Sequence, residues 1–192
     1  MPEARFEQAI AAIDAANADD PTAITVRGTV RPKELAHAEL VTEWVVALRP
    51  DASDALLVAA RAHHLRRWTV PRTSYPTGRA GYLRWRKDLH EQHAREVGEI
   101  LATVGYENEM IDRVQNLVRK RGLGRDPEVQ TLEDALCLVF LETQFHDMVE
   151  RLDSDTLHGV VEKTVKKMSS EAVSRVPELP LPTEDLKILF GH

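Results

Sequence analysis

The sequence of 192 residues has a single cysteine, Cys137, and fewer positive than negative charges, giving a net charge of −6. One cysteine excludes an internal disulfide and is typical of a reducing compartment, so we expect a cytoplasmic protein. The charge balance argues against a general nucleic-acid coat or a membrane-surface binder. No apolar run approaches the roughly 18 residues of a membrane span. The N-terminus is acidic, without the apolar core of a signal peptide.

Motifs of several large enzyme classes are also missing. The sequence contains no G-x-x-x-x-G-K-[ST] loop for nucleoside triphosphates, no G-x-S-x-G elbow for a nucleophilic serine and no cysteine pair for a zinc knuckle. Cys137 lies in the apolar run DALCLVFL, which indicates a packed core thiol rather than a nucleophile.

What is present is helical periodicity. Apolar residues recur three and four positions apart along most of the chain, which predicts an all-α single domain of about seven helices over residues 1–175. Residues 176–192 form a Pro-rich tail that we expect along the surface. The pattern TLED predicts the start of the sixth helix at Thr131, and this helix is apolar nearly all round, so it should be central. Residues 22–28 suggest a short extended arm.

Four of the predicted helices carry a histidine or an aspartate on the stripe that should face the core. These residues are His37, His64 with His63 beside it, His93 and Asp134. Burying such polar groups separately would cost roughly 1–3 kcal/mol each, so we expect them to share one site. Imidazole and carboxylate groups that meet inside a helical bundle form a metal centre or an acid–base cluster.

Three stretches carry a family resemblance: ARAHHLRRW, PRTSYPTGRAGYLRWR and QTLEDALCLVFLE. They are similar to motifs of the family called domain of unknown function 4202, and the similarity covers about residues 5 to 170. More distantly, the order of the inward histidines and the final aspartate resembles the HD-domain superfamily of metal-dependent phosphohydrolases. That resemblance implies an HD-like helical bundle.

The superfamily resemblance also implies individual roles. His37, His63 and Asp134 match metal ligands, and His93 matches a histidine that often follows them.

Two departures from the superfamily pattern affect the metal. His64 stands where the superfamily has an aspartate, and Arg119 to Arg121 stand where two-metal members have a further histidine. Helical periodicity favours His64 as the ligand, whereas the alignment favours His63, and both stay candidates. A single imidazole-rich site favours Zn, Fe, Mn, Co or Ni over Mg. A metal-free site is the alternative.

A basic segment lies between two of the predicted ligand helices. Residues 61–87 contain eight basic residues and no acidic one, and seven of the eight are arginine. Arginine binds phosphate bidentately, and the interleaved aromatic residues offer stacking faces. We therefore expect this segment to bind an anionic, phosphorylated small molecule, and nucleic acid is a less favoured ligand. The alternative is that the segment is a solvated surface loop without a ligand. The expected ligand-binding residues are Arg66, Arg67, Arg72, Arg79 and Lys120.

The leading hypothesis is a metal-dependent phosphohydrolase acting on a small phosphorylated metabolite or nucleotide, in which the ion polarises a phosphoryl oxygen and activates a water. His93 or Glu133 would transfer a proton. Glu133 also lies near a helix N-terminus, where the dipole stabilises a carboxylate without any catalytic duty. The alternatives are an iron-dependent oxygenase on the same fold and a non-catalytic module that binds nucleotide or RNA. The sequence does not indicate an oligomeric state.

Overall fold

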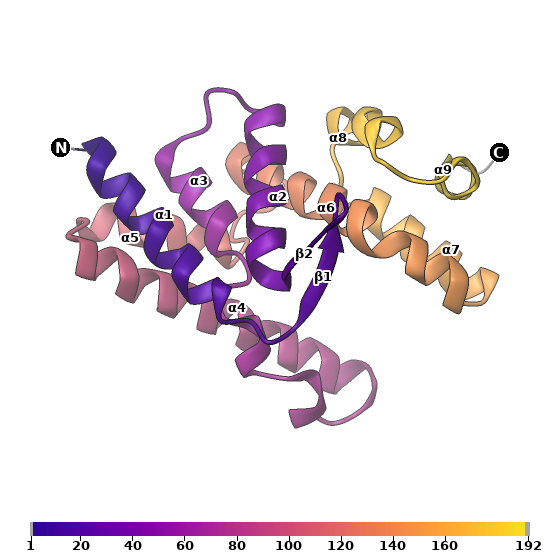
Figure 1. The fold of residues 1–192 in the computed structure, drawn as a ribbon, viewed down its shortest axis with the longest axis horizontal. Helices are drawn as coiled ribbons and strands as arrows, with labels where there is room; N and C mark the ends of the chain where they lie inside the picture. The colour runs from indigo at the N-terminus through magenta and orange to yellow at the C-terminus, as the bar shows by residue number, and fades with distance from the viewer. Residues whose placement is uncertain (1, 191–192) are drawn as a thin grey trace.

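A computed structural model describes residues 2–190, and Figure 1 shows that helices make up most of the protein. The all-α prediction is confirmed at the level of fold class. The described residues form nine α-helices, and the two beyond the expected seven are the short helices α8 and α9 near the C-terminus. The helices are α1 (Pro2–Ala18), α2 (Lys33–Leu48), α3 (Asp54–Ala62), α4 (Gly78–Val104), α5 (Asn108–Val118), α6 (Pro127–Arg151), α7 (Ser154–Val165), α8 (Ser170–Arg175) and α9 (Thr183–Phe190).

The expected extended arm is one strand of a hairpin. Strands β1 (Ala23–Val26) and β2 (Thr29–Pro32) pair antiparallel, with Val26 opposite Thr29. The two residues between them, Arg27 and Gly28, both have positive φ, of 49° and 80°. This combination is the one that a two-residue type I′ turn requires. The hairpin leads directly into α2 and so fixes where that helix begins.

The start of α2 is anchored by the side chain of Asp20. Its Oδ2 accepts a hydrogen bond from the backbone N–H of Glu34 at 3.0 Å, and its Oδ1 accepts one from the N–H of Thr22 at 2.9 Å. The carboxylate therefore satisfies one free N–H group at the start of α2, as a capping residue does, and joins it to the segment just before β1. As a result, the first turn of α2 and its acidic side chain have a fixed position.

The central helix is α6, as predicted, but it begins four residues earlier than the predicted start at Thr131. Pro127 occupies the first turn, and the side chain of Asp126 accepts hydrogen bonds from the backbone N–H groups of Glu128 and Val129. Proline and a capping aspartate together define a helix start. The Thr131 hydroxyl instead donates to the carbonyl of Pro127 within the helix.

Two clusters of buried apolar residues surround α6. The larger one joins its first half to helices α1 to α5, and the smaller one joins its second half to the C-terminal segment. Figure 1 shows these two groups of helices at opposite ends of α6. In the smaller cluster Leu138, Leu141 and Phe145 pack against Leu157 and Leu179.

The Pro-rich tail contains ordered structure. It includes a 3-10 turn at Val176–Glu178 and helix α9, whose buried Asp185 accepts a hydrogen bond from His146 Nδ1 at 2.9 Å. Leu179 is buried as well, so part of the tail belongs to the packed interior. The domain boundary at residue 175 stays a prediction. Within residues 2–190, none of the helices has both the length and the apolar content to cross a bilayer.

Candidate active site

Three potential metal-binding side chains meet where α2 faces the end of α3. Glu34 and His37 lie three residues apart on α2, hence on one face of the helix, and His64 follows α3. Their ligand atoms all lie within 4.8 Å of one another. Glu34 Oε2 accepts a hydrogen bond from His64 Nδ1 at 3.0 Å and lies 3.7 Å from His37 Nδ1. We call Glu34, His37 and His64 the donor trio.

The orientation of His37 leaves one of its nitrogens free for a ligand. The Thr143 hydroxyl donates its only proton to the carbonyl of Val139 at 2.7 Å, and it lies 3.3 Å from His37 Nε2. The hydroxyl must therefore accept from Nε2–H, which leaves Nδ1 of a neutral imidazole as a lone pair directed towards Glu34. A histidine whose second nitrogen is held by a neighbouring group is the usual arrangement of a metal ligand.

The surroundings of His64 and Glu34 shift the pKa values of both groups. Burial lowers the pKa of His64 to about 3, against the opposing influence of Glu34, so this imidazole is neutral near pH 7. Burial acts to raise the pKa of Glu34, but His64, which donates a hydrogen bond to it, brings that pKa below its ordinary value. A carboxylate beside a neutral imidazole is the charge state in which these two groups bind metals.

The adjacent histidines His63 and His64 follow directly after helix α3, which ends at Ala62, and both reach the site. The backbone of His63 keeps α-helical dihedral angles, with φ of −55° and ψ of −24°, and the two rings lie 4.2 Å apart, centre to centre. His63 Nδ1 donates to the carbonyl of Ala60 at 2.8 Å, and burial lowers the pKa of this imidazole well below its ordinary value. Both residues line the cavity, but only His64 belongs to the donor trio.

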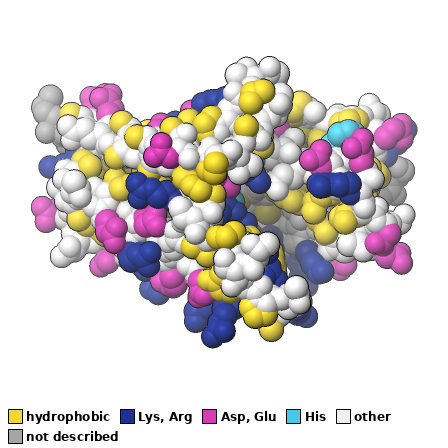
Figure 2. All heavy atoms as spheres, turned by 60° about the horizontal axis from the view of Figure 1, so that its bottom comes forward, with side chains coloured by type: hydrophobic (Ala, Val, Ile, Leu, Met, Phe, Trp, Pro, Cys, Tyr) yellow, Lys and Arg dark blue, Asp and Glu magenta, His cyan; other side chains and the backbone are white. Residues whose placement is uncertain are grey.

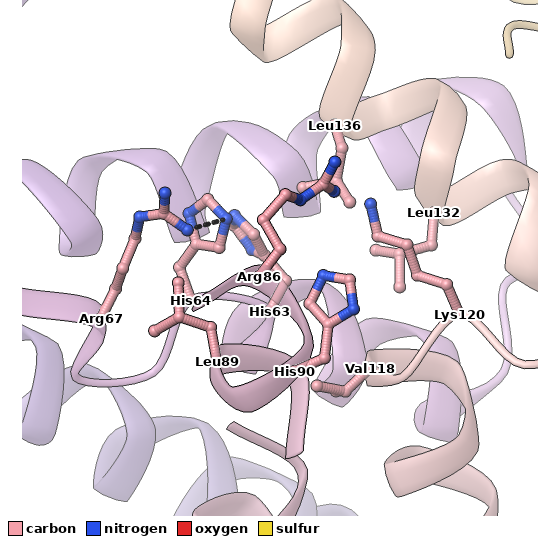
Figure 3. A pocket seen from close by; sticks show the side chains of 10 residues that line it. All are labelled: His63, His64, Arg67, Arg86, Leu89, His90, Val118, Lys120, Leu132 and Leu136. Atoms are coloured by element: carbon pink, nitrogen blue, oxygen red, sulfur yellow. Dashed lines mark hydrogen bonds between the residues drawn. The ribbon is translucent and has the colours of Figure 1, made fainter. Parts of the chain in front are cut away.

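A cavity of about 410 Å³ opens beside the trio and is lined by His37 and His64 but not by Glu34. Figure 2 shows one face of the molecule, with a hollow near its middle and basic and hydrophobic side chains along the edges of the hollow. Figure 3 shows a smaller neighbouring pocket, in which Arg86 and Lys120, which line the cavity as well, extend towards Leu136. Four cationic side chains and a single carboxylate, Glu133, line the cavity; the cationic ones are Arg67, Arg86, Lys120 and Lys167.

Glu133 holds two of these cations together. Lys120 Nζ donates to its Oε2, and Lys167 Nζ lies 3.6 Å from its Oε1, while the Glu133 side chain is only 4% exposed. Burial lowers the pKa of Lys120, whereas Glu133 raises it. Burial acts to raise the pKa of Glu133, yet Lys120 brings it below its ordinary value, so this carboxylate is ionised near pH 7. Lys120 also has a left-handed backbone, with φ of 57°, which costs energy for a residue other than glycine.

Arg67 connects the cavity to the donor trio. Its Nη1–H donates to His64 Nε2 at 3.4 Å, and its Nε lies 3.9 Å from Glu34 Oε1. The guanidinium also stacks over the ring of Trp85, with its central carbon 4.7 Å from the ring centre. A guanidinium stacked on an indole is held in place while its remaining N–H groups can bind an anion.

Several predicted site residues lie elsewhere. Asp134 Oδ1 accepts hydrogen bonds from the Gln130 side chain and the backbone N–H of Ser169, and Asp134 neither joins the donor trio nor lines the cavity. Arg72 donates to the carbonyls of its own loop, at Tyr75 and Pro76. The others that the cavity does not reach are His93, Arg66 and Arg79.

His93 is fully buried beneath the site. Its Nδ1 donates to the carbonyl of Leu65 at 2.8 Å, and its Nε2 has no hydrogen-bond partner among the described residues. Burial lowers its pKa to about 3. The ring centre lies 5.9 Å from that of His64, so His93 packs behind the donor trio and does not face the cavity.

Three residues of the candidate site were not predicted from the sequence: Glu34, Arg86 and Lys167. Glu34 could have been found because it lies three residues before His37, on the same helix face. Arg86 and His93 lie seven residues apart, which is two helical turns, so Arg86 shares a face of α4 with a predicted site residue. Lys167 lies beyond the end of α7, and its sequence neighbours give no comparable signal.

Comparison with known proteins identifies a family and no activity. The family model described as "Domain of unknown function (DUF4202)" matches residues 7–189, nearly the whole chain. No curated protein and no solved structure matches the chain.

Proposed function

Since the chain belongs to the DUF4202 family, whose description names no activity, we propose from the site that it is a metal-dependent phosphohydrolase with an HD-like bundle. Its substrate on this proposal is a small phosphorylated molecule. The observation that carries the proposal is that two imidazoles of the donor trio and four cationic side chains line one cavity. Metal ligands beside an excess of cations are what hydrolysis of a phosphate ester requires.

The donor trio fits a divalent transition metal. Two imidazole nitrogens and one carboxylate oxygen are the protein ligands of several catalytic zinc sites and of non-haem iron sites. The lone pair of His37 Nδ1, directed at Glu34 without a hydrogen bond, supports this assignment. On this proposal Glu34 is the carboxylate ligand in place of Asp134. A bound metal would supply a Lewis acid for the phosphoryl oxygen and a more acidic water.

The residues of the chain itself bind and orient the phosphate. Arg86, Lys120 and Lys167 neutralise its charge from one side of the cavity, and Arg67 does so from the side of the donor trio. Glu133 pairs with both lysines, so its carboxylate neutralises part of their charge until a phosphate binds. Preorganised cations of this kind stabilise the charge that develops on the phosphoryl oxygens.

An iron-dependent oxygenase is the second candidate, because its facial triad has the same composition as the donor trio. The cations of the cavity favour the hydrolase, since an oxygenase has no general need for an electropositive substrate pocket. Oxygen consumption by the iron-loaded protein, without release of phosphate, would establish the oxygenase instead.

The test is phosphate release from a panel of phosphomonoesters by protein loaded with Zn, Mn, Fe, Co or Ni. We expect His37→Ala to reduce the rate at least about 100-fold, as loss of a metal ligand does. Arg86→Gln should raise KM about tenfold, because one charged phosphate contact is worth roughly 1.4 kcal/mol or more. Arg84→Gln is the matched control, since Arg84 lies on the same helix and outside the cavity. Full activity after chelation and in His37→Ala would contradict the proposal, and phosphate binding without turnover would indicate a non-catalytic binding module.

A further inference from the structure

The cavity is not cationic throughout. Besides the charged residues, its lining includes a group of apolar side chains from α6 and α7: Phe140, Met148 and Val160, with Val41 and Val139 nearby. A phosphate group alone makes no use of such a surface. The positions of these residues along the cavity indicate which kind of ligand would contact this surface.

Helix α6 is charged at one end of its cavity face and largely apolar beyond it, with Gln144 as a polar exception. The lining residues Glu133, Cys137, Phe140, Gln144 and Met148 are spaced three and four apart, so they form one stripe. Glu133 is at the charged end of this stripe, paired with Lys120 and Lys167. At 1.5 Å per residue, Phe140 lies about 10 Å further along the helix and Met148 about 22 Å.

The lining residues of helix α7 also change from charged to apolar, but in the opposite chain direction. Its lining residues are Val160 and Thr164, followed by Lys167 just beyond the helix, again at spacings of four and three. Lys167 Nζ lies 3.6 Å from Glu133 Oε1, so the charged ends of the two stripes coincide. Val160 lies about 10 Å from Lys167 along the helix axis. Both walls of the cavity therefore change from charged to apolar in the same direction.

We propose that the ligand is an amphipathic anion, with one phosphate and an apolar body of about 10 Å, and not a sugar phosphate or a free inorganic ion. The phosphate binds between Arg86, Lys120 and Lys167, and the apolar body lies against Phe140 and Val160. A volume of about 410 Å³ is within the range of cavities that enclose small organic ligands. The identity of the anionic group rests on the proposed function, whereas the apolar body rests on the cavity wall alone.

The test is the affinity of the full-length protein, by titration calorimetry, for inorganic phosphate and for methyl-, butyl- and hexylphosphonate, which the enzyme cannot hydrolyse. A methylene that is half buried tightens binding about twofold, so hexylphosphonate should bind about 30-fold more tightly than methylphosphonate. Alkylsulfonates of the same chain lengths form the second series. A sulfonate also carries a negative charge at one end, but it is not a phosphate analogue.

Variants of the apolar wall separate the two ends of the cavity. Phe140→Ala should weaken hexylphosphonate about tenfold and leave inorganic phosphate unchanged, and Val160→Asn is a second variant in case Phe140→Ala does not fold. Val149→Ala is the matched control, because Val149 is an apolar residue of α6 that packs in the smaller cluster and does not line the cavity.

The outcomes distinguish this inference from the proposed function. Phosphate and all phosphonates binding with equal affinity would overturn the apolar body and leave the phosphate site intact. Chain-length dependence in the sulfonates alone, with no binding of phosphate, would support the apolar body and contradict the phosphohydrolase. No binding in either series would overturn both.

Discussion

Replacing Glu133 with glutamine removes one charge from the cavity and leaves the shape of the side chain nearly unchanged. In the wild-type protein this carboxylate is 4% exposed and pairs with Lys120, which is 19% exposed, and with Lys167, which is 43% exposed. Removing one partner of a buried ion pair costs about 3–5 kcal/mol. Here Lys120 can lose its proton, because burial already lowers its pKa, and Lys167 can turn towards solvent. We therefore expect Glu133→Gln to lower the free energy of unfolding by about 2–3 kcal/mol.

The same substitution should improve anion binding. Glu133 occupies the position of an anion between the two lysines, so in the variant an added phosphate takes over part of its role. We expect inorganic phosphate to bind Glu133→Gln about tenfold more tightly than the wild type. At saturating phosphate, the gain in free energy of unfolding on phosphate binding should therefore be about 1.4 kcal/mol larger for the variant than for the wild type.

Urea unfolding of both proteins, with and without phosphate at constant ionic strength, measures both effects. In a chain of this size a loss of 2–3 kcal/mol also lowers Tm by roughly 5–10 °C. Glu150→Gln is the control, since Glu150 lies on the same helix and is 66% exposed, and its exposed pair with His146 should contribute less than about 0.5 kcal/mol. Wild-type stability of Glu133→Gln, or an unchanged response to phosphate, would refute this account of the cavity.

Two further predictions concern pH and backbone packing. Burial lowers the pKa of His90 to about 4 and that of His93 to about 3, so the unfolded chain binds protons below about pH 6.5 that the native protein does not. Each histidine therefore contributes stability above pH 6.5 that is lost as the pH falls towards 4, by up to roughly 1.4 kcal/mol per pH unit. Urea unfolding at pH 7 and at pH 5 measures this loss, and equal free energies of unfolding at the two pH values would contradict the prediction. A Cβ at Gly81 would lie 1.9 Å from the carbonyl oxygen of Pro76, so Gly81→Ala should cost about 1–3 kcal/mol. Gly159→Ala, where the nearest heavy atom is 4.0 Å away, should stabilise helix α7 by up to about 1 kcal/mol, and equal thermal stability of the two variants would show the packing argument to be wrong.

Much of the helical fold could be predicted because local signals mark its boundaries. Ser53 caps α3 through a hydrogen bond from the N–H of Leu56, and Gly105 ends α4 with φ of 88°. The start of α6 was misplaced because TLED resembles a capping box, although Asp126 and Pro127 upstream provide the stronger signal. Helix α9 depends on packing against α6, which no local pattern in a Pro-rich segment reveals.

The residue types of the candidate site could be predicted from the sequence, but not all of the individual residues that belong to it. Helical stripes identified His37 and His64, because periodicity follows from local geometry. The same reasoning selected Asp134, whose carboxylate instead accepts hydrogen bonds from Gln130 and Ser169. A stripe shows that a residue faces inwards, but it does not show which of several inward polar groups it meets. Those pairings depend on how α6 lies against α2 and α8, which is a tertiary property.

Metal content is the measurement that tests the donor trio most directly. Elemental mass spectrometry would be applied to untagged protein purified without chelators, and to the variants Glu34→Gln, His37→Ala and Asp134→Asn. Our account predicts about one Zn, Fe, Mn, Co or Ni per chain in the wild type and in Asp134→Asn, and loss of the metal from Glu34→Gln and His37→Ala. Absence of metal from the wild type after reconstitution, or loss that follows Asp134 and spares Glu34, would contradict it.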